Sequence, residues 1–249
     1  MQREVWAMKR KYWLLLLVFA VLLNGSPVLA DGDFYVVAVG GGVGTKITSL
    51  PYTISTPGFY YLGGNLSFDS GDGITVNTDN VTIDLMGFCL SGTNNGYGIY
   101  MGGRKNVEIR NGVVRGWNQG ICEGVGPNDS HGHRVINIRA ANNGYGIALT
   151  GRDNLIKGCT ALNNTIAGIH LNNIGTISNN VVNNCSLGIL AYGGSVIGNT
   201  VTCNSGQTGI ELTPDTSTYI MMDQNTVNGN GTHKSGGSSA TVYGTNAGF

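Results

Sequence analysis

The side chains best suited to chemistry lie in one glycine-rich segment, EGVGPNDSHGH, which runs from Glu123 to His133. Between these two residues it also contains Asp129 and His131, so two carboxylates and two imidazoles fall within one short segment. Carboxylates and imidazoles are the usual groups of general acid–base catalysis when they can reach a substrate proton. Because loops are polar with or without a function, a solvated loop is the alternative interpretation.

Basic residues on either side of this segment extend it to a candidate ligand-binding patch. The patch comprises Arg104, Glu123, Asp129, His131, His133, Arg134 and Arg152. Eight basic and four acidic residues lie in the interval 98–158, which therefore carries a charge of +4. A basic region on a weakly acidic chain favours an anionic glycan or a phosphate-bearing surface as partner, with simple solvation of the charges as the alternative. The chain as a whole is not basic, which argues against nucleic acid.

A repeated Gly-Ile pair shows which elements must position these residues. The glycines of the pair are Gly73, Gly98, Gly120, Gly146, Gly168, Gly188 and Gly209, at spacings of 25, 22, 26, 22, 20 and 21 residues. A period of 20 to 25 residues with short β-rich units is typical of a stacked solenoid. Each unit offers three short strands separated by Gly or Asn turns, which predicts about seven coils joined by parallel sheets.

Alternation along the first strand of each coil predicts which side chains face the interior. With the isoleucine inside, the residues two positions further on also point inward: Val76, Met101, Glu123, Leu149, Leu171, Ala191 and Leu212. The residues between them then point outward: Thr75, Tyr100, Cys122, Ala148, His170, Leu190 and Glu211. Glu123 is the exception among the inward residues, because the other six are apolar.

The third strand of each coil predicts a second set of stacked positions. Aligning RAANN, TALNN, NVVNN, TVTCN and TVNGN places Ala140, Ala161, Val181, Val201 and Val227 inside. The same alignment stacks Asn143, Asn164, Asn184, Asn204 and Asn230 at one turn, and Cys159, Asn179, Asn199 and Asn225 at another. Asparagine suits sharp turns because it tolerates a left-handed backbone, and stacked amides can hydrogen-bond along the column.

On this Gly-Ile and Asn periodicity the chain resembles the right-handed parallel β-helix proteins of the pectate-lyase-like superfamily. The resemblance is greatest to the periplasmic repeat type related to nitrous-oxide-reductase maturation factors. It implies an all-β fold, a single right-handed parallel β-helix over residues 73–230, with entry strands and a cap over 31–72 and a C-terminal tail or cap over 231–249. It does not imply an activity, because one architecture carries many functions.

The catalytic patterns of β-helix enzymes are not complete here. The sequence resembles polygalacturonases at Asn77-Thr78-Asp79, His131-Gly132-His133 and Leu155-Ile156-Lys157, but it contains no Asp-Asp pair to supply the acid and the base. The outward positions carry one histidine, His170, and one carboxylate, Glu211. A calcium-dependent lyase needs several converging carboxylates, and a glycosidase needs a carboxyl pair. The sequence therefore assigns no catalytic residues.

The first thirty residues have the layout of a secretory signal peptide. Arg10 and Lys11 precede the apolar run Leu14 to Leu23, and small residues allow cleavage near Ala30. That run is too short to span a bilayer. The mature chain would be secreted or periplasmic and have no membrane span. Its ten basic and thirteen acidic residues give it a net charge of −3.

The five cysteines do not predict a metal site, because no CxxC or Cys/His spacing is present. They are Cys89, Cys122, Cys159, Cys185 and Cys203. Their odd number in an exported chain leaves at least one outside any intramolecular disulfide. Buried small apolar side chains are the favoured interpretation, with one disulfide possible, and neither a metal nor another cofactor is expected.

The leading hypothesis is an exported, non-catalytic β-helix that serves as a rigid binding or surface-structural module, with carbohydrate as the favoured ligand class and an anionic polysaccharide as the candidate partner. The first alternative is a polysaccharide lyase, hydrolase or epimerase with its site at the segment from Glu123 to His133. The second alternative is a passive protein that associates through the ends of the stack.

Overall fold

The computed structural model describes residues 44–124, 130–202, 208–213, 219–236 and 241–248. They all belong to one compact unit, Val37–Phe249. Within these ranges the regular structure consists of 23 β-strands without an α-helix, so no helix here is long and apolar enough to cross a membrane. The proposed signal peptide, Asp129 and Cys203 lie outside the described residues.

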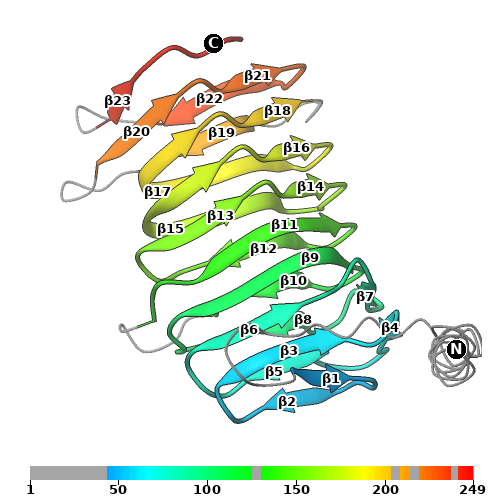
Figure 1. Ribbon diagram of the computed structural model, residues 1–249. Helices are drawn as coiled ribbons and strands as arrows, with labels where there is room; N and C mark the ends of the chain where they lie inside the picture. The colour runs from blue at the N-terminus through cyan, green and yellow to red at the C-terminus, as the bar shows by residue number, and fades with distance from the viewer. Residues whose placement is uncertain (1–43, 125–129, 203–207, 214–218, 237–240, 249) are drawn as a thin grey trace, which may run out of the picture. The chain divides into compact units, whose positions relative to one another are not determined.

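The strands form three parallel columns, here called the first, second and third sheets (Figure 1). The first sheet contains β2 (Tyr52–Ile54), β5 (Ile74–Val76), β8 (Tyr97–Tyr100), β10 (Gln119–Cys122), β12 (Tyr145–Leu149), the start of β15 (Ala167–Ser178), the start of β17 (Leu187–Ile197), β19 (Thr208–Leu212) and β22 (Thr232–Gly236).

The second sheet contains β1 (Thr45–Ile47), β3 (Gly58–Leu62), β6 (Val81–Asp84), the start of β9 (Val107–Arg115), the start of β11 (Arg134–Ala141), β13 (Asn154–Lys157), the ends of β15 and β17, β20 (Ile220–Asp223) and β23 (Thr241–Tyr243). The third sheet contains β4 (Leu66–Ser67), β7 (Cys89–Ser91), the ends of β9 and β11, β14 (Thr160–Leu162), β16 (Val181–Asn183), β18 (Thr200–Thr202) and β21 (Thr226–Asn228).

The chain visits the three sheets in turn and then starts the next coil, which makes a right-handed parallel β-helix of about seven turns and confirms the predicted fold class. The columns begin before the first Gly-Ile pair, because β2, β3 and β4 already pair in register with β5, β6 and β7. They also extend beyond residue 230, since β22 and β23 continue the first and second sheets.

The isoleucines of the repeat stack in the interior as predicted. The fully buried set is Ile74, Ile99, Ile121, Ile147, Ile169, Ile189 and Ile210. Residue pairing aligns Ile99 with Ile121 and Ile121 with Ile147, one coil after the other. The inward positions two residues further on are buried too, and they include Glu123. Burial of this apolar surface is the main stabilising contribution to the coil stack.

The glycine of each pair is required by close approach between coils. A Cβ at Gly98 would lie 2.5 Å from the carbonyl oxygen of Gly120, and one at Gly120 would lie 2.7 Å from that of Gly146. Real side chains do not make such contacts with backbone, so an alanine here would push the coils apart. The glycine column therefore permits the close spacing between coils that the hydrogen bonds between strands impose.

The predicted stacking of the third strand is wrong by one residue at the coil that contains β16. Val182, not Val181, pairs with Ala161 and is fully buried, whereas Val181 is 45% exposed. Val181 and Val182 fit the apolar position equally well by type, so the sequence pattern does not distinguish them. A one-residue shift exchanges the inner and outer faces of a strand, so the asparagines on either side of β16 shift with it.

Buried asparagines connect successive coils at two turns. The turn between the third and first sheets has Asn143 and Asn164 followed by Cys185, while Asn184 faces solvent with a φ of 52°. The turn between the second and third sheets has Cys159 followed by Asn180, not Asn179, and then Asn199, Asn225 and Asn246.

Asn199 illustrates how these asparagines bond. Its Oδ1 accepts a hydrogen bond from the backbone N–H of Asn180 at 3.0 Å, and its Nδ2 donates to the carbonyl oxygen of Ile177 at 3.0 Å. Both backbone groups are thereby satisfied where no strand partner reaches them.

Candidate functional site

The six candidate residues that the structure describes are divided between the coil interior, the turn between the first and second sheets, and the second sheet. Glu123 and His133 lie inside the coil and are completely buried. Arg104, His131 and Arg152 lie at the turn between the first and second sheets, and Arg134 lies on the second sheet. Asp129 falls outside the described residues.

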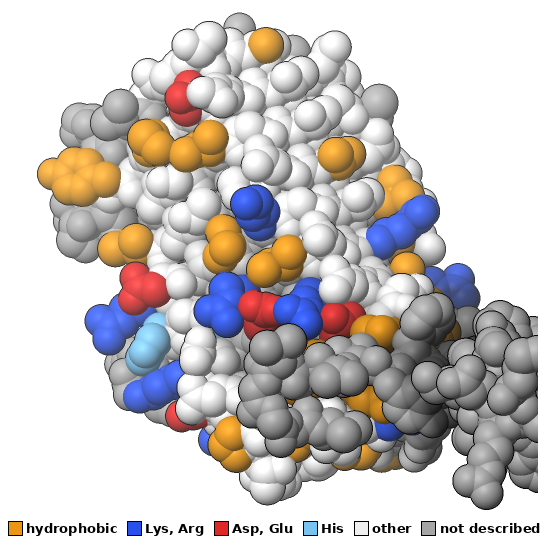
Figure 2. Space-filling view, in the orientation of Figure 1, with side chains coloured by type: hydrophobic (Ala, Val, Ile, Leu, Met, Phe, Trp, Pro, Cys, Tyr) orange, Lys and Arg blue, Asp and Glu red, His pale blue; other side chains and the backbone are white. Residues whose placement is uncertain are grey.

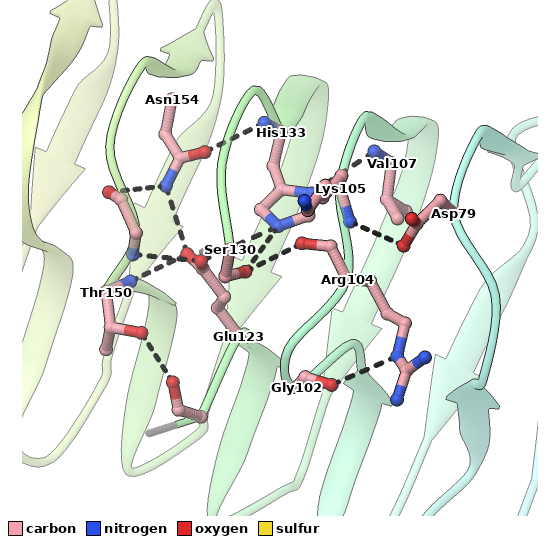
Figure 3. Close-up of polar contacts among 12 residues, drawn as sticks. Asp79, Gly102, Arg104, Lys105, Val107, Glu123, Ser130, His133, Thr150 and Asn154 are labelled. Carbon is pink, nitrogen blue, oxygen red and sulfur yellow. Dashed lines mark hydrogen bonds and ion pairs between the residues drawn. The ribbon is translucent and has the colours of Figure 1, made fainter. Parts of the chain in front are cut away.

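Glu123 is held by donors from the next coil (Figure 3). Its Oε2 accepts hydrogen bonds from the backbone N–H of Thr150 at 2.7 Å and from Nδ2 of Asn154 at 3.0 Å. Its Oε1 accepts one from the backbone N–H of Gly151 at 2.9 Å. A buried carboxylate is tolerable only when such donors replace water.

His133 uses both ring nitrogens within the coil. Its Nδ1 accepts a hydrogen bond from the backbone N–H of Val107 at 3.2 Å, which requires this nitrogen to be unprotonated. Its Nε2 therefore carries the proton and faces Ser130 Oγ at 3.1 Å and Glu123 Oε1 at 3.6 Å. The hydroxyl of Ser130 in turn donates to the carbonyl oxygen of Arg104 at 2.7 Å.

His133 also takes the place that asparagine takes at the other turns. Its Nδ1 accepts from the preceding coil, and its own backbone N–H donates to Asn154 Oδ1 at 2.8 Å on the next coil. We call Glu123, Ser130, His133 and Asn154 the buried polar cluster. Its hydrogen bonds run from coil to coil, so its geometry is that of a structural element.

The buried polar cluster does not have the geometry of a catalytic triad. In a triad the nucleophile and the acid contact different imidazole nitrogens. Here Ser130 and Glu123 both face Nε2 of His133, and the other nitrogen is occupied by Val107. Burial acts to raise the pKa of Glu123, but hydrogen bonds from His133, Ser130 and Gly151 outweigh it, so the pKa lies below its ordinary value. Glu123 is therefore an ionised, fully paired carboxylate at neutral pH.

The turn between the first and second sheets carries basic side chains on successive coils. Backbone bridges align Lys105 with His131 and His131 with Arg152. Arg104 precedes Lys105, and its guanidinium donates to the carbonyl oxygens of Gly102 at 3.2 Å and Asn77 at 3.3 Å. We call Arg104, Lys105, His131 and Arg152 the basic corner.

Exposure differs between the members of the basic corner. The side chain of Arg152 is 58% exposed and has only a 4.0 Å ion pair with the equally exposed Asp153. A loose, solvated pair of this kind contributes little to stability and leaves the guanidinium accessible. Lys105 is the first of the three bridged residues of the basic corner. Its backbone N–H donates a hydrogen bond to Asp79 Oδ1 at 3.0 Å, which attaches it to the preceding coil.

Arg134 belongs to a different arrangement, on the outer face of the second sheet. Its Nε lies 2.8 Å from Glu108 Oε2, while the other oxygen of Glu108 lies 2.9 Å from Nη1 of Arg110. Arg110 also lies 2.8 Å from Asp84. Basic and acidic side chains alternate in a row across this face (Figure 2). Since each of these charges has an opposite partner, the row is compensated.

The outward residues His170 and Glu211 do not form an acid–base pair. His170 packs between the rings of Tyr145 and Tyr192, at centroid distances of 5.9 Å and 5.8 Å. Burial lowers the pKa of His170, so its imidazole is neutral at neutral pH. Glu211 lies two coils further along the same column, because His170 pairs with Leu190 and Leu190 with Glu211.

Sequence reasoning did not single out Ser130 and Asn154, which complete the buried polar cluster. One feature of the sequence indicates the buried polar cluster, namely the inward position of Glu123 among apolar residues. A carboxylate there must have buried donors, and His133 and Asn154 are polar residues at the corresponding turn of the neighbouring coils.

The chain was compared with known proteins. No curated protein and no solved structure matches it. Among protein families, residues 61–246 match the one described as "Periplasmic copper-binding protein (NosD)". This match covers about three quarters of the sequence and nearly all of the coils described above. The chain belongs to the NosD family of periplasmic β-helix proteins.

Proposed function

We propose that this protein is an exported, non-catalytic β-helix that binds an anionic polysaccharide through its basic corner. The observation that supports this function best is the stacking of Lys105, His131 and Arg152 on three successive coils. Adjacent strands of a sheet lie about 4.8 Å apart, so a chain-like ligand that runs along this part of the stack meets a basic residue on each of these three coils.

The rigidity of the coils favours this role. The backbone of each corner residue is held by hydrogen bonds to neighbouring coils, for example from Gly132 N–H to Arg152 O at 3.0 Å and from Asn106 N–H to His131 O at 3.0 Å. A ligand therefore meets basic groups whose backbone positions are set before it binds, which lowers the entropic cost of association.

Export is part of the proposal and rests on two independent supports. The family is described as periplasmic. The sequence begins with a basic stretch, an apolar run and small residues before Asp31, as expected of a cleaved leader.

Copper is not part of the proposed function, although the description of the family names it. Copper sites in proteins use imidazole, thiolate or thioether ligands. Within the part of the chain that the structure describes, no three His, Cys, Asp or Glu side chains are placed to hold a metal ion. Burial raises the pKa of Cys122 to about 12 and that of Cys159 to about 11, so these thiols stay protonated, and both nitrogens of His133 are occupied.

Affinity electrophoresis of the mature chain tests the proposal. Gels that contain polygalacturonate, alginate or dextran sulfate are compared with gels that contain neutral dextran. We expect at least one anionic polysaccharide to retard the protein, and the effect to weaken as salt is added. Retardation by none of them, or equally by neutral dextran, contradicts the proposal.

Charge-matched variants locate the binding surface. The double variant Lys105→Gln/Arg152→Gln is expected to lose about tenfold in affinity, from the ~0.2–1 kcal/mol that each exposed ion pair contributes. The control Arg115→Gln/Arg139→Gln removes the same charge from exposed positions on the third sheet and is expected to change affinity less than about twofold. Equal losses in both variants would show that net charge, rather than the basic corner, determines binding.

A further inference from the structure

The outer face of the first sheet carries a stacked aromatic pair beside the basic corner. Tyr97 and Tyr100 belong to β8, and their ring centroids lie 5.1 Å apart with an interplanar angle of 19°. Both side chains are partly exposed. The two rings stack on each other, and the parts of them that remain exposed form one continuous apolar surface.

Two glycines make room for this pair. A Cβ at Gly124 would lie 2.7 Å from a ring carbon of Tyr100, and a Cβ at Gly102 would overlap the Tyr100 hydroxyl. The ring of Tyr100 therefore lies across the backbone of Gly102 and Gly124, where any larger residue would displace it. This close contact orients the ring without a hydrogen bond.

Gly102 also connects the aromatic pair to the basic corner. Its carbonyl oxygen accepts the 3.2 Å hydrogen bond from Nε of Arg104. The Tyr100 ring and the Arg104 guanidinium therefore both contact Gly102. This places an apolar ring next to a cation. A sugar ring with an acidic substituent has the matching pair of features, because one face of the ring consists of C–H bonds and the substituent is an anion.

We propose that Tyr97 and Tyr100 form a platform for one sugar ring of the bound polysaccharide, with the acidic group of that sugar at Arg104. This inference rests on the proposed function and narrows its ligand to polymers of acidic sugars, such as polyuronates. Aromatic planes bind apolar faces by dispersion and desolvation. A guanidinium binds a carboxylate with charge-assisted hydrogen bonds. Together these contacts distinguish a sugar acid from other polyanions.

The experiment compares two probes, polygalacturonate and polyglutamate, which both carry carboxylates but only one of which has sugar rings. We expect the wild-type chain to bind polygalacturonate more tightly. Tyr100→Ala is expected to lose about tenfold for polygalacturonate and less than about twofold for polyglutamate. Lys105→Gln should weaken binding of both probes, since it removes only charge.

Two further variants separate the platform from general effects. Gly102→Ala keeps every charge and aromatic residue but displaces the ring of Tyr100, so it should reproduce the loss seen for Tyr100→Ala. The control Tyr61→Ala disrupts a second aromatic stack, Phe59 and Tyr61 on the second sheet, and should leave affinity for polygalacturonate unchanged. Thermal unfolding of each variant checks that the coils remain folded.

The outcomes distinguish the two proposals. If the wild-type chain binds no acidic polysaccharide, the proposed function fails and the platform fails with it. If it binds polygalacturonate but Tyr100→Ala and Gly102→Ala leave that binding unchanged, only the platform is overturned. If Tyr100→Ala lost the same affinity for polygalacturonate and for polyglutamate, the platform would also be overturned, because the ring would then contribute to binding without recognising a sugar.

Discussion

The buried polar cluster and the basic corner lie on the same coils, but they differ in burial and in hydrogen bonding. His133 is completely buried with both nitrogens in use, whereas His131, two residues earlier, lies at the partly exposed basic corner. Between them stands Gly132 with a φ of 73°, a left-handed conformation that reverses the direction of the chain. The left-handed residue Gly132 thus separates a residue with a structural role from one with a proposed binding role.

This comparison shows why a dense set of acids and histidines in a sequence need not be an active site. Glu123 accepts hydrogen bonds from Thr150, Gly151 and Asn154 of the next coil, and His133 is hydrogen-bonded to Val107 and Ser130. The proposed ligand contacts instead involve the less conspicuous basic residues of the turn. The following three experiments test that division, from the largest expected effect to the smallest.

Removal of the carboxylate from the buried polar cluster should have the largest effect. Glu123→Ala leaves the N–H groups of Thr150 and Gly151 and one of the two N–H groups of the Asn154 amide without an acceptor inside the coil. Breaking a buried charge network by removing one partner costs about 3–5 kcal/mol. Urea unfolding should show a clearly lower midpoint than wild type, and Glu123→Gln, which retains an acceptor oxygen, should fall between the two. An unchanged midpoint for Glu123→Ala would mean that the cluster is not structural.

Acid should weaken the same cluster. The folded-state pKa of Glu123 lies below its value in the unfolded chain, so its ionised form stabilises the fold. That stabilisation is fully present above the unfolded-state pKa and is lost as the pH falls through the lower folded-state pKa. The difference in thermal midpoint between wild type and Glu123→Gln should therefore shrink between neutral pH and about pH 3. A constant difference over this interval would contradict the assignment of an ionised Glu123.

Substitution at the basic corner should have the smallest effect on stability. Arg152 is largely exposed and its pairing with Asp153 is loose, so Arg152→Gln is expected to change the free energy of unfolding by less than about 0.5 kcal/mol. The measurement is the same urea titration as for Glu123→Ala. A loss above about 1 kcal/mol would make Arg152 part of the structural network, and the contrast between the two regions would then disappear.

The sequence predicted the fold well because the solenoid repeats one local rule. The position of each Gly-Ile pair determined the interior isoleucines and the inward residues two positions further on, and both are confirmed. Two residues that the alternation placed outward, Cys122 and Ala148, are nevertheless buried, so an outward position on the first sheet does not by itself mean exposure. The prediction failed at β16, where Val181 and Val182 are equivalent by type and only the neighbouring coils decide which one is buried.

The arrangement of the candidate patch was less accessible to sequence reasoning. Proximity in sequence placed Glu123, His131 and Arg134 in one group, but the turn and the alternation of the strand send them to the interior, the corner and the second sheet. The partner of Arg134 is Glu108 on the adjacent coil, and the carbonyl of Gly102 holds Arg104. Contacts of this kind depend on side-chain conformations across coils, which no spacing rule specifies.

The glycine column has a consequence for how such a protein can change over time. Because hydrogen bonds between the strands set the pitch and Gly98, Gly120 and Gly146 leave room for it, the pitch does not depend on the identity of the outward side chains. Corner residues and surface tyrosines can therefore be replaced without altering the distance from one coil to the next. The surface positions therefore keep a constant spacing, and substitutions there can change binding specificity while the fold stays the same.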